Sequence, residues 1–158
     1  MRPFAVTPTV DVHFLLPGTD YADAFALDIY DPTLDAPSAA RRAFHHMPHW
    51  VGALLTVRNI VVSPFGLRAT PDPALSEDQR IGIFPVISTS PERVVMGFDD
   101  AHLNFRVVVE VEDQQTGTRR VTATTLVKRN NTFGGAYLRA VMPFHKAIVP
   151  AILARVAA

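Results

Sequence analysis

The second half of the chain is dominated by alternating apolar and polar residues. Period-two patterns of this kind are typical of strands, and they cover four segments: 81–89, 93–98, 102–113 and 119–129. The connections between these segments are three to five residues long. A parallel crossover needs about a dozen residues or more. The sequence therefore predicts four consecutive antiparallel strands.

The strand at 102–113 has one apolar row and one mostly polar row. The apolar row is Leu103, Phe105, Val107, Val109 and Val111, and the opposite row is His102, Asn104, Arg106, Val108, Glu110 and Glu112. This pattern predicts an antiparallel sheet with one dry face and one wetter face. The pattern leaves open which of the two rows lines the interior.

A long helix is predicted from about Phe133 to Val156. Its apolar stripe is Phe133, Tyr137, Val141, Phe144, Ile148 and Ile152. Pro143 and Pro150 lie roughly opposite this stripe, and a proline bends its helix away from itself. Their positions favour one helix bent around a concave sheet. The alternative is two shorter helices, the second starting at Pro143.

The start of this helix carries a capping signal, Asn131-Thr132-Phe133-Gly134-Gly135. Backbone amides at a helix start can hold an anion. We interpret the segment instead as an Asn or Thr cap, followed by glycines that permit close packing.

The first half of the chain predicts a strand followed by two helices. Residues 24–30 alternate as a strand does, and Asp35 can cap a helix over 36–47. Pro48 ends that helix and can begin a second, which continues to about residue 63.

Two further segments lie outside this pattern. An additional strand is expected over 10–16, ended by Pro17 and Gly18. The proline-containing segment Leu67–Arg80 is interpreted as a long surface loop, and the alternative is a lid or binding loop.

This element order predicts an α+β protein with a single domain over 1–158, in which 1–19 form an extra strand or arm. A curved antiparallel sheet wrapped around a long C-terminal helix is the helix-grip arrangement. Such an arrangement often leaves a cavity for a small molecule between sheet and helix.

Composition excludes several classes of protein. The absence of cysteine excludes disulfides, thiolate metal sites and cysteine nucleophiles. The 15 basic and 15 acidic residues cancel, which argues against nucleic-acid binding. No apolar run reaches the roughly 20 residues of a membrane helix, and the first residues do not resemble a secretory signal. We therefore expect a cytoplasmic protein that binds neither nucleic acid nor membrane.

Polar residues at the start of the wetter row are candidates for catalysis. Asp100, His102, Asn104 and Arg106 alternate, so in a strand they point to one face. A carboxylate beside an imidazole can hold its tautomer, so Asp100 and His102 form the candidate acid–base pair. Asn104 and Arg106 would bind the ligand. The other interpretation is that this face meets solvent.

The helices supply four further candidates for ligand contacts: Trp50, Arg58, Tyr137 and His145. His145 lies beside an apolar stripe, where it could line the cavity or serve as a core histidine with one hydrogen bond. Arg58 could clamp a ligand carboxylate or form an ion pair with Asp99 or Asp100.

The three clustered histidines, His45, His46 and His49, do not predict a metal site. Pro48 interrupts the helix just before His49 and breaks its i,i+4 spacing from His45. No acidic residue lies near them in the motif. We predict no metal and no cofactor.

Four segments carry a resemblance to a known family: Asp20–Phe25, Leu55–Asn59, Gly97–Arg106 and Pro143–His145. They resemble an uncharacterised bacterial family, a domain of unknown function related to START and polyketide-cyclase-like (SRPBCC) proteins. Gly97–Arg106 is the most specific segment, and the resemblance runs from about Asp20 to the end. It implies a START-like helix-grip fold and no established reaction.

Three functions are compatible with these observations. The first is binding of a small, largely apolar molecule between sheet and terminal helix. The second is an enzyme of cyclase, isomerase or hydrolase type that uses the Asp100–His102 pair. The third is a non-catalytic accessory or homodimerisation module, because the resembling family includes proteins with a partner domain. Residues 1–79 and 80–158 carry net charges of −4 and +4, so the two halves could attract each other within one fold or between copies. The other interpretation is scattered surface charge.

Overall fold

The computed structural model describes residues 1–65, 75–115 and 117–158. Its strands are β1 (Phe4–Val6), β2 (Tyr21–Ile29), β3 (Arg80–Ile81), β4 (Phe84–Thr89), β5 (Arg93–Asp99), β6 (Leu103–Asp113) and β7 (Arg119–Arg129). Its helices are α1 (Val12–Leu15), α2 (Ala36–His45), α3 (His49–Val62) and α4 (Thr132–Leu153), with 3-10 turns η1 (Ser63–Phe65), η2 (Glu77–Gln79) and η3 (Ala154–Ala157).

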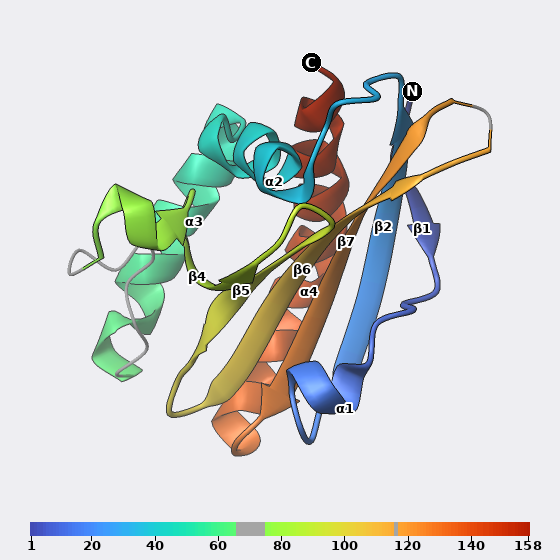
Figure 1. Ribbon diagram of the computed structural model, residues 1–158. Coiled ribbons are helices and arrows are strands. Elements are labelled where there is room, and N and C mark those ends of the chain that lie inside the picture. Colours follow the sequence, from blue (N-terminus) through green and yellow to red (C-terminus); the bar gives the residue numbers. More distant parts are fainter. Residues whose placement is uncertain (66–74, 116) are drawn as a thin grey trace.

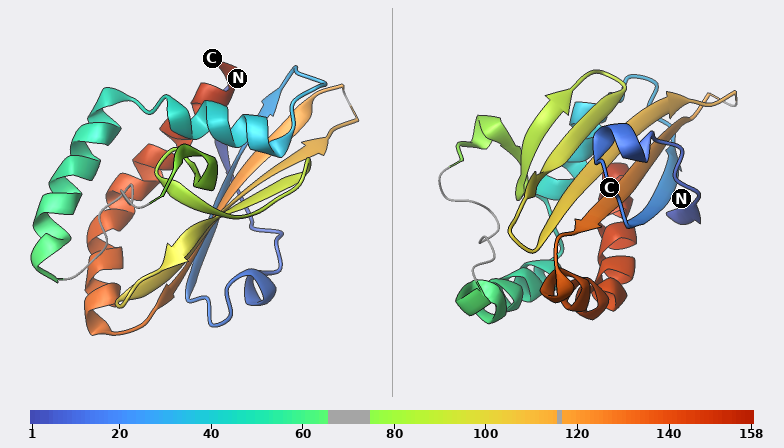
Figure 2. Two further views of the ribbon diagram at one scale, coloured as in Figure 1. Left: turned by 60° about the vertical axis from the view of Figure 1, so that its left-hand side comes forward. Right: turned by 90° about the horizontal axis from the view of Figure 1, so that it is seen from below.

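The strands form one curved sheet in the order β1-β2-β7-β6-β5-β4-β3 (Figure 1). Every neighbouring pair is antiparallel, which confirms the predicted hairpins. The single strand predicted over 81–89 is wrong, because a turn at Gly82, whose φ is 58°, divides this segment into β3 and β4. Helices α2, α3 and α4 lie on the concave side of the sheet, and α1 lies on the opposite side (Figure 2). The chain is thus an α+β protein whose sheet grips a long C-terminal helix.

Helix α4 runs without a break through Pro143 and Pro150, so the prediction of one helix is confirmed. Pro143 is exposed and Pro150 is only partly buried. The two prolines have no backbone N–H to donate, and both positions lie away from the core. The predicted cap is also confirmed, because the Asn131 side chain accepts a hydrogen bond from the Gly134 amide at 2.9 Å.

Helices α2 and α3 begin where the sequence predicts. Asp35 caps α2 by accepting a hydrogen bond from the Ser38 amide at 2.8 Å. Pro48 separates α2 from α3 at the N-cap of the second helix. Part of the predicted loop over Leu67–Arg80 lies outside the described residues. Its described end contains η2 and β3.

The strand expected over 10–16 is wrong. The Asp11 side chain accepts a hydrogen bond from the Phe14 amide at 3.1 Å and caps the single turn of α1. A local side-chain bond of this kind competes with strand pairing. The extra strand lies earlier, where β1 pairs with β2.

The outer face of the sheet has a small core of its own. Val10 and Leu16, on either side of α1, cover Val95, Val108 and Leu126. Val108 belongs to the mostly polar row of β6, and it is fully buried here. This face is therefore wet only beyond the area that the N-terminal segment covers.

At Gly134, α4 packs closely against the rest of the chain. A Cβ at this position would collide with the backbone carbonyl oxygen of His102. We expect Gly134→Ala to lower the free energy of unfolding by about 1–3 kcal/mol, because a backbone atom yields less readily than a side chain. Urea denaturation measures the change.

Gly52 provides the matched control within a helix. A Cβ there would meet nothing within 4 Å. Gly52→Ala should therefore raise stability by about 0.5–1 kcal/mol through helix propensity. Equal effects of the two substitutions would contradict the packing argument for Gly134.

Candidate functional site

A cavity of about 510 Å³ lies between the concave face of the sheet and helices α2, α3 and α4. Protein cores contain few voids larger than a water molecule. A space of this size is typical of small-molecule sites, which occupy about 300–1,000 Å³. The cavity is therefore the strongest candidate site in the part of the chain that the structure describes.

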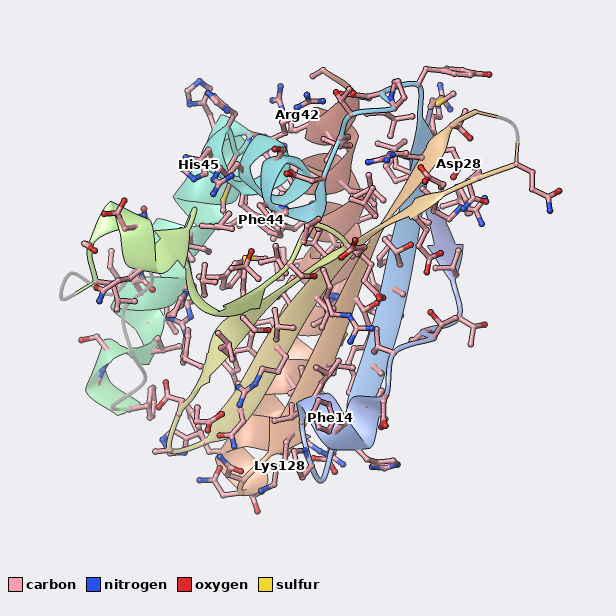
Figure 3. The ribbon with its side chains drawn as sticks, viewed as in Figure 1. Phe14, Asp28, Arg42, Phe44, His45 and Lys128 are labelled. Atoms are coloured by element: carbon pink, nitrogen blue, oxygen red, sulfur yellow. The ribbon has the colours of Figure 1, made fainter. Side chains whose placement is uncertain are left out.

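The floor of the cavity is the inner face of β6 and β7. Val107 and Val109 contribute from β6, and Ala123 and Val127 contribute from β7. On α2, Phe44 points inward and its ring packs edge-on against Phe84 at a centroid distance of 5.4 Å (Figure 3).

Helices α3 and α4 form the walls of the cavity. Their side chains face it and leave its interior open. Only Val51 and Val62 of α3 are buried, whereas Leu54, Leu55 and Val61 line the open space. Most apolar residues of α3 therefore border the cavity and do not pack into the core.

Helix α4 and the turn after it, Thr132–Ala157, are long and apolar enough to span a membrane by these two criteria alone, with a mean hydropathy of 1.4. In the fold, eleven residues of α4 line the cavity. The apolar composition of this helix is thus accounted for by its position as a cavity wall.

The apolar row of β6 is the row that faces the cavity. Asn104 and Arg106 point to the other face, so their expected position in a ligand site is corrected. The Asn104 side-chain oxygen accepts a hydrogen bond from the Asn130 amide group at 2.9 Å. Arg106 pairs with Asp99 at 2.9 Å. Because side chains alternate between the two faces of a strand, the row that lines the cavity leaves the other row on the opposite face of the sheet.

Asp100 and His102 lie in the turn between β5 and β6, and the predicted acid–base pair does not form. The two ring nitrogens of His102 lie 3.0 Å from the Phe65 carbonyl oxygen and 2.8 Å from the Asn131 amide nitrogen. The ring packs against Phe133 with centroids 4.5 Å apart. His102 thus ties η1 and the start of α4 to the sheet, and neither it nor Asp100 lines the cavity.

Trp50 also lies outside the cavity, which corrects its expected role. It is 45% exposed, and it borders a surface hollow near the C-terminal end with His49 and Arg155. Trp50 is in the first turn of α3, where its neighbour Val51 is the residue that packs into the core.

Three predicted ligand-binding residues do line the cavity: Arg58, Tyr137 and His145. The Arg58 Nε donates a hydrogen bond to the Tyr137 hydroxyl at 2.8 Å, and the guanidinium lies 5.7 Å from that ring's centroid. This contact joins α3 to α4. Asp99, one of the ion-pair partners considered for Arg58, is paired with Arg106.

His145 takes part in a network that the sequence did not predict. Its Nε2 lies 3.0 and 3.1 Å from the two carboxylate oxygens of Asp23 on β2. The Tyr21 hydroxyl donates to the same carboxylate at 2.6 Å. The His145 and Asp23 side chains are only 16% and 19% exposed.

The network sets the protonation of Asp23 and Tyr21. Burial by itself raises the pKa of Asp23, but the hydrogen bonds from His145 and Tyr21 outweigh it and hold that pKa below its usual range. Burial and the bond to Asp23 raise the pKa of the Tyr21 hydroxyl. Asp23 is therefore an ionised acceptor and Tyr21 a neutral donor at neutral pH.

A sequence signal for Asp23 exists. The inward row of β2 is Tyr21, Asp23, Phe25, Leu27 and Ile29, in which one acidic residue interrupts an apolar series. Our predicted strand began at Ala24, so the series started one residue too late to include Asp23.

Thr125 is a second polar residue that sequence reasoning missed. It pairs with Asp23 across the β2–β7 ladder and lines the cavity. It is 8% exposed, and its hydroxyl has no hydrogen-bond partner among the described residues. Thr125, Arg58, Tyr137 and His145 are the polar side chains of the described lining.

The clustered histidines lie away from the cavity. His45 and Arg42 extend outward from α2 into solvent (Figure 3). Across the described ranges, no group of three or more His, Asp or Glu side chains is placed to hold a metal ion.

The fold and the cavity define an α+β helix-grip protein with an apolar interior site. Residues 15–152 match the family model described as "Protein of unknown function (DUF2867)". The chain belongs to this family, which confirms the expected domain of unknown function. No curated protein matches the chain. Among solved structures, the crystal structure of Ara h 8.0201 is similar at 10% identity, with 86% of this chain and 98% of that chain covered and a TM-score of 0.29.

Proposed function

We propose that this protein binds one small, largely apolar molecule in the cavity between the sheet and helices α3 and α4. The observation that carries the proposal is the cavity itself, about 510 Å³ with an almost wholly apolar lining. Leaving such a surface to water costs free energy in proportion to its apolar area. An apolar molecule that displaces this water would recover that free energy.

The few polar groups would orient the bound molecule. Arg58 and Tyr137 are joined by a hydrogen bond on the helix walls, and Thr125 and His145 lie where the sheet meets α4. A few polar groups in an apolar pocket are typical of sites that fix the direction of a ligand. The proposed ligand is therefore apolar over most of its length and polar at one or two positions.

The same proposal includes a relation to START and polyketide-cyclase-like proteins. Its support is the curved antiparallel sheet that grips a long C-terminal helix. An internal cavity between sheet and helix agrees with that relation.

A fluorescence titration with N-phenyl-1-naphthylamine tests the binding proposal. This apolar probe brightens when it leaves water. We expect saturable binding of one probe per chain with a Kd on the order of 1–10 μM, which corresponds to about 7–8 kcal/mol. A linear, non-saturating response would overturn the proposal.

A cavity-filling substitution provides the decisive comparison. Ala123 is buried on the cavity floor, so Ala123→Trp places an indole where the probe would lie. We expect probe affinity to fall at least about tenfold, or 1.4 kcal/mol. Ala136→Trp, on the exposed face of α4, is the matched control and should bind normally. Equal binding by both variants would place the probe elsewhere.

A further inference from the structure

His145 is held in one orientation on the cavity wall, with one ring nitrogen occupied. Its Nε2 faces the Asp23 carboxylate at 3.0 Å. An ionised carboxylate only accepts hydrogen bonds, so in the neutral form of the ring Nε2 carries the hydrogen and Nδ1 is bare. Among the described residues, Nδ1 has no hydrogen-bond partner. An imidazole with this arrangement is prepared to accept a proton.

Asp23 would stabilise the charge that such a transfer creates. Protonated Nδ1 makes the ring a cation whose other N–H already contacts a carboxylate. Beside a mostly apolar cavity lining, this pair interacts more strongly than it would in water. The Tyr21 hydroxyl, 2.6 Å from Asp23, fixes the carboxylate in turn.

Thr125 supplies a hydrogen-bond donor beside this pair. It lies directly across from Asp23 in the sheet register, and the residue is 8% exposed. Among the described residues, the buried hydroxyl without a partner is that of Thr124, so the Thr125 hydroxyl is open to the cavity that Thr125 lines. A carbonyl oxygen on the bound molecule would satisfy the Thr125 hydroxyl.

We propose that Asp23 and His145 act as a general base toward an apolar carbonyl compound bound in the cavity, removing a proton from the carbon next to its carbonyl group. The inference rests on the proposed binding function. The proton moves to His145 Nδ1, and the C–H electron pair becomes the enolate double bond. The carbonyl π electrons move to oxygen, which accepts a hydrogen bond from Thr125. The imidazolium then returns a proton to carbon, so no oxidant or other reactant is required.

Deuterium exchange of 2-tetralone tests this inference. The probe is an apolar bicyclic ketone whose protons next to the carbonyl exchange with D₂O through an enolate. NMR follows their loss with the wild-type protein and with His145→Gln, Asp23→Asn and Thr125→Val. His46→Gln, at an exposed histidine outside the cavity, is the matched control. Binding of N-phenyl-1-naphthylamine, measured for each variant, reports whether the fold and cavity are intact.

We expect the wild-type protein to accelerate exchange by about 100-fold or more over buffer, the usual range for a positioned general base. His145→Gln should lose nearly all of this acceleration and Asp23→Asn at least about tenfold, while probe binding persists. Thr125→Val should lose about tenfold if the hydroxyl holds the carbonyl oxygen. His46→Gln should exchange like the wild type.

The outcomes separate this inference from the binding proposal. Saturable probe binding with equal exchange by wild type and His145→Gln overturns the general base and leaves the binding proposal standing. Absence of saturable probe binding overturns the binding proposal. A purely structural Asp23–His145 contact would alter stability without changing the exchange rate, which would also overturn the catalytic inference.

Discussion

Replacing Asp23 by alanine is expected to lower the free energy of unfolding by about 2–3 kcal/mol. The substitution leaves His145 Nε2 and the Tyr21 hydroxyl without their shared acceptor, and the His145 side chain is only 16% exposed. Removing one partner of a fully buried pair costs about 3–5 kcal/mol. The remaining exposure of this network reduces that figure. Chemical denaturation followed by circular dichroism measures the change.

The pH dependence provides an independent check on Asp23. Its pKa is lower in the folded chain than in an unfolded one, because the bonds from His145 and Tyr21 outweigh burial. The stabilisation it contributes is therefore complete above its unfolded value of about 3.9 and is lost as pH falls through the folded value. The stability gap between the wild type and Asp23→Asn should narrow below about pH 4.

An exposed ion pair is the matched control for Asp23. Asp113 bonds Arg119 at 2.8 Å, but its side chain is 78% exposed. Asp113→Ala should change stability by less than about 1 kcal/mol, as surface pairs do. If Asp23→Ala lowers the free energy of unfolding no more than Asp113→Ala does, the network does not stabilise the contact between α4 and the sheet.

Leu126→Ala is expected to cost about 2–4 kcal/mol, although Leu126 lies on the outer face of the sheet. The residue is fully buried, and it packs in the cluster formed by Val10, Leu16, Val95 and Val108. Truncating a buried leucine loses its transfer free energy and leaves a cavity behind. Urea denaturation with a linear fit measures the loss.

The control for Leu126 is a large apolar residue that the fold leaves exposed. Ile60 on α3 is 69% exposed, so Ile60→Ala should change stability by no more than about 0.5 kcal/mol. A Leu126→Ala effect of the same size would mean that the N-terminal segment does not cover the sheet in solution.

Leu126 also shows what the alternation of apolar and polar residues in a strand does not predict. One dry row and one wetter row in β6 predict a sheet with a single core. The structure adds a second cluster, because Val10 and Leu16 pack on the wetter face. These two residues lie about a hundred positions away along the chain. Nothing in the local alternation of β6 or β7 indicates such a cover.

The candidate site, too, could be predicted from the sequence only in part. Arg58, Tyr137 and His145 could be placed near the cavity from helical spacing alone. Asp100 and His102 could not be excluded from it, because alternation defines two faces of a strand without naming the inner one. The partner of His145 is Asp23, 122 positions earlier in the sequence.

By itself, the sequence determined the antiparallel strands, the caps of α2 and α4 and the α+β class, and it favoured one terminal helix over two. These features follow from local causes: residue periodicity, short connections, and side chains that bond nearby amides. Only the tertiary structure decided which row of β6 lines the cavity, and that Asp23 meets His145 and Arg58 meets Tyr137. Those contacts depend on how the sheet curves around α4, which brings together residues that no local pattern connects.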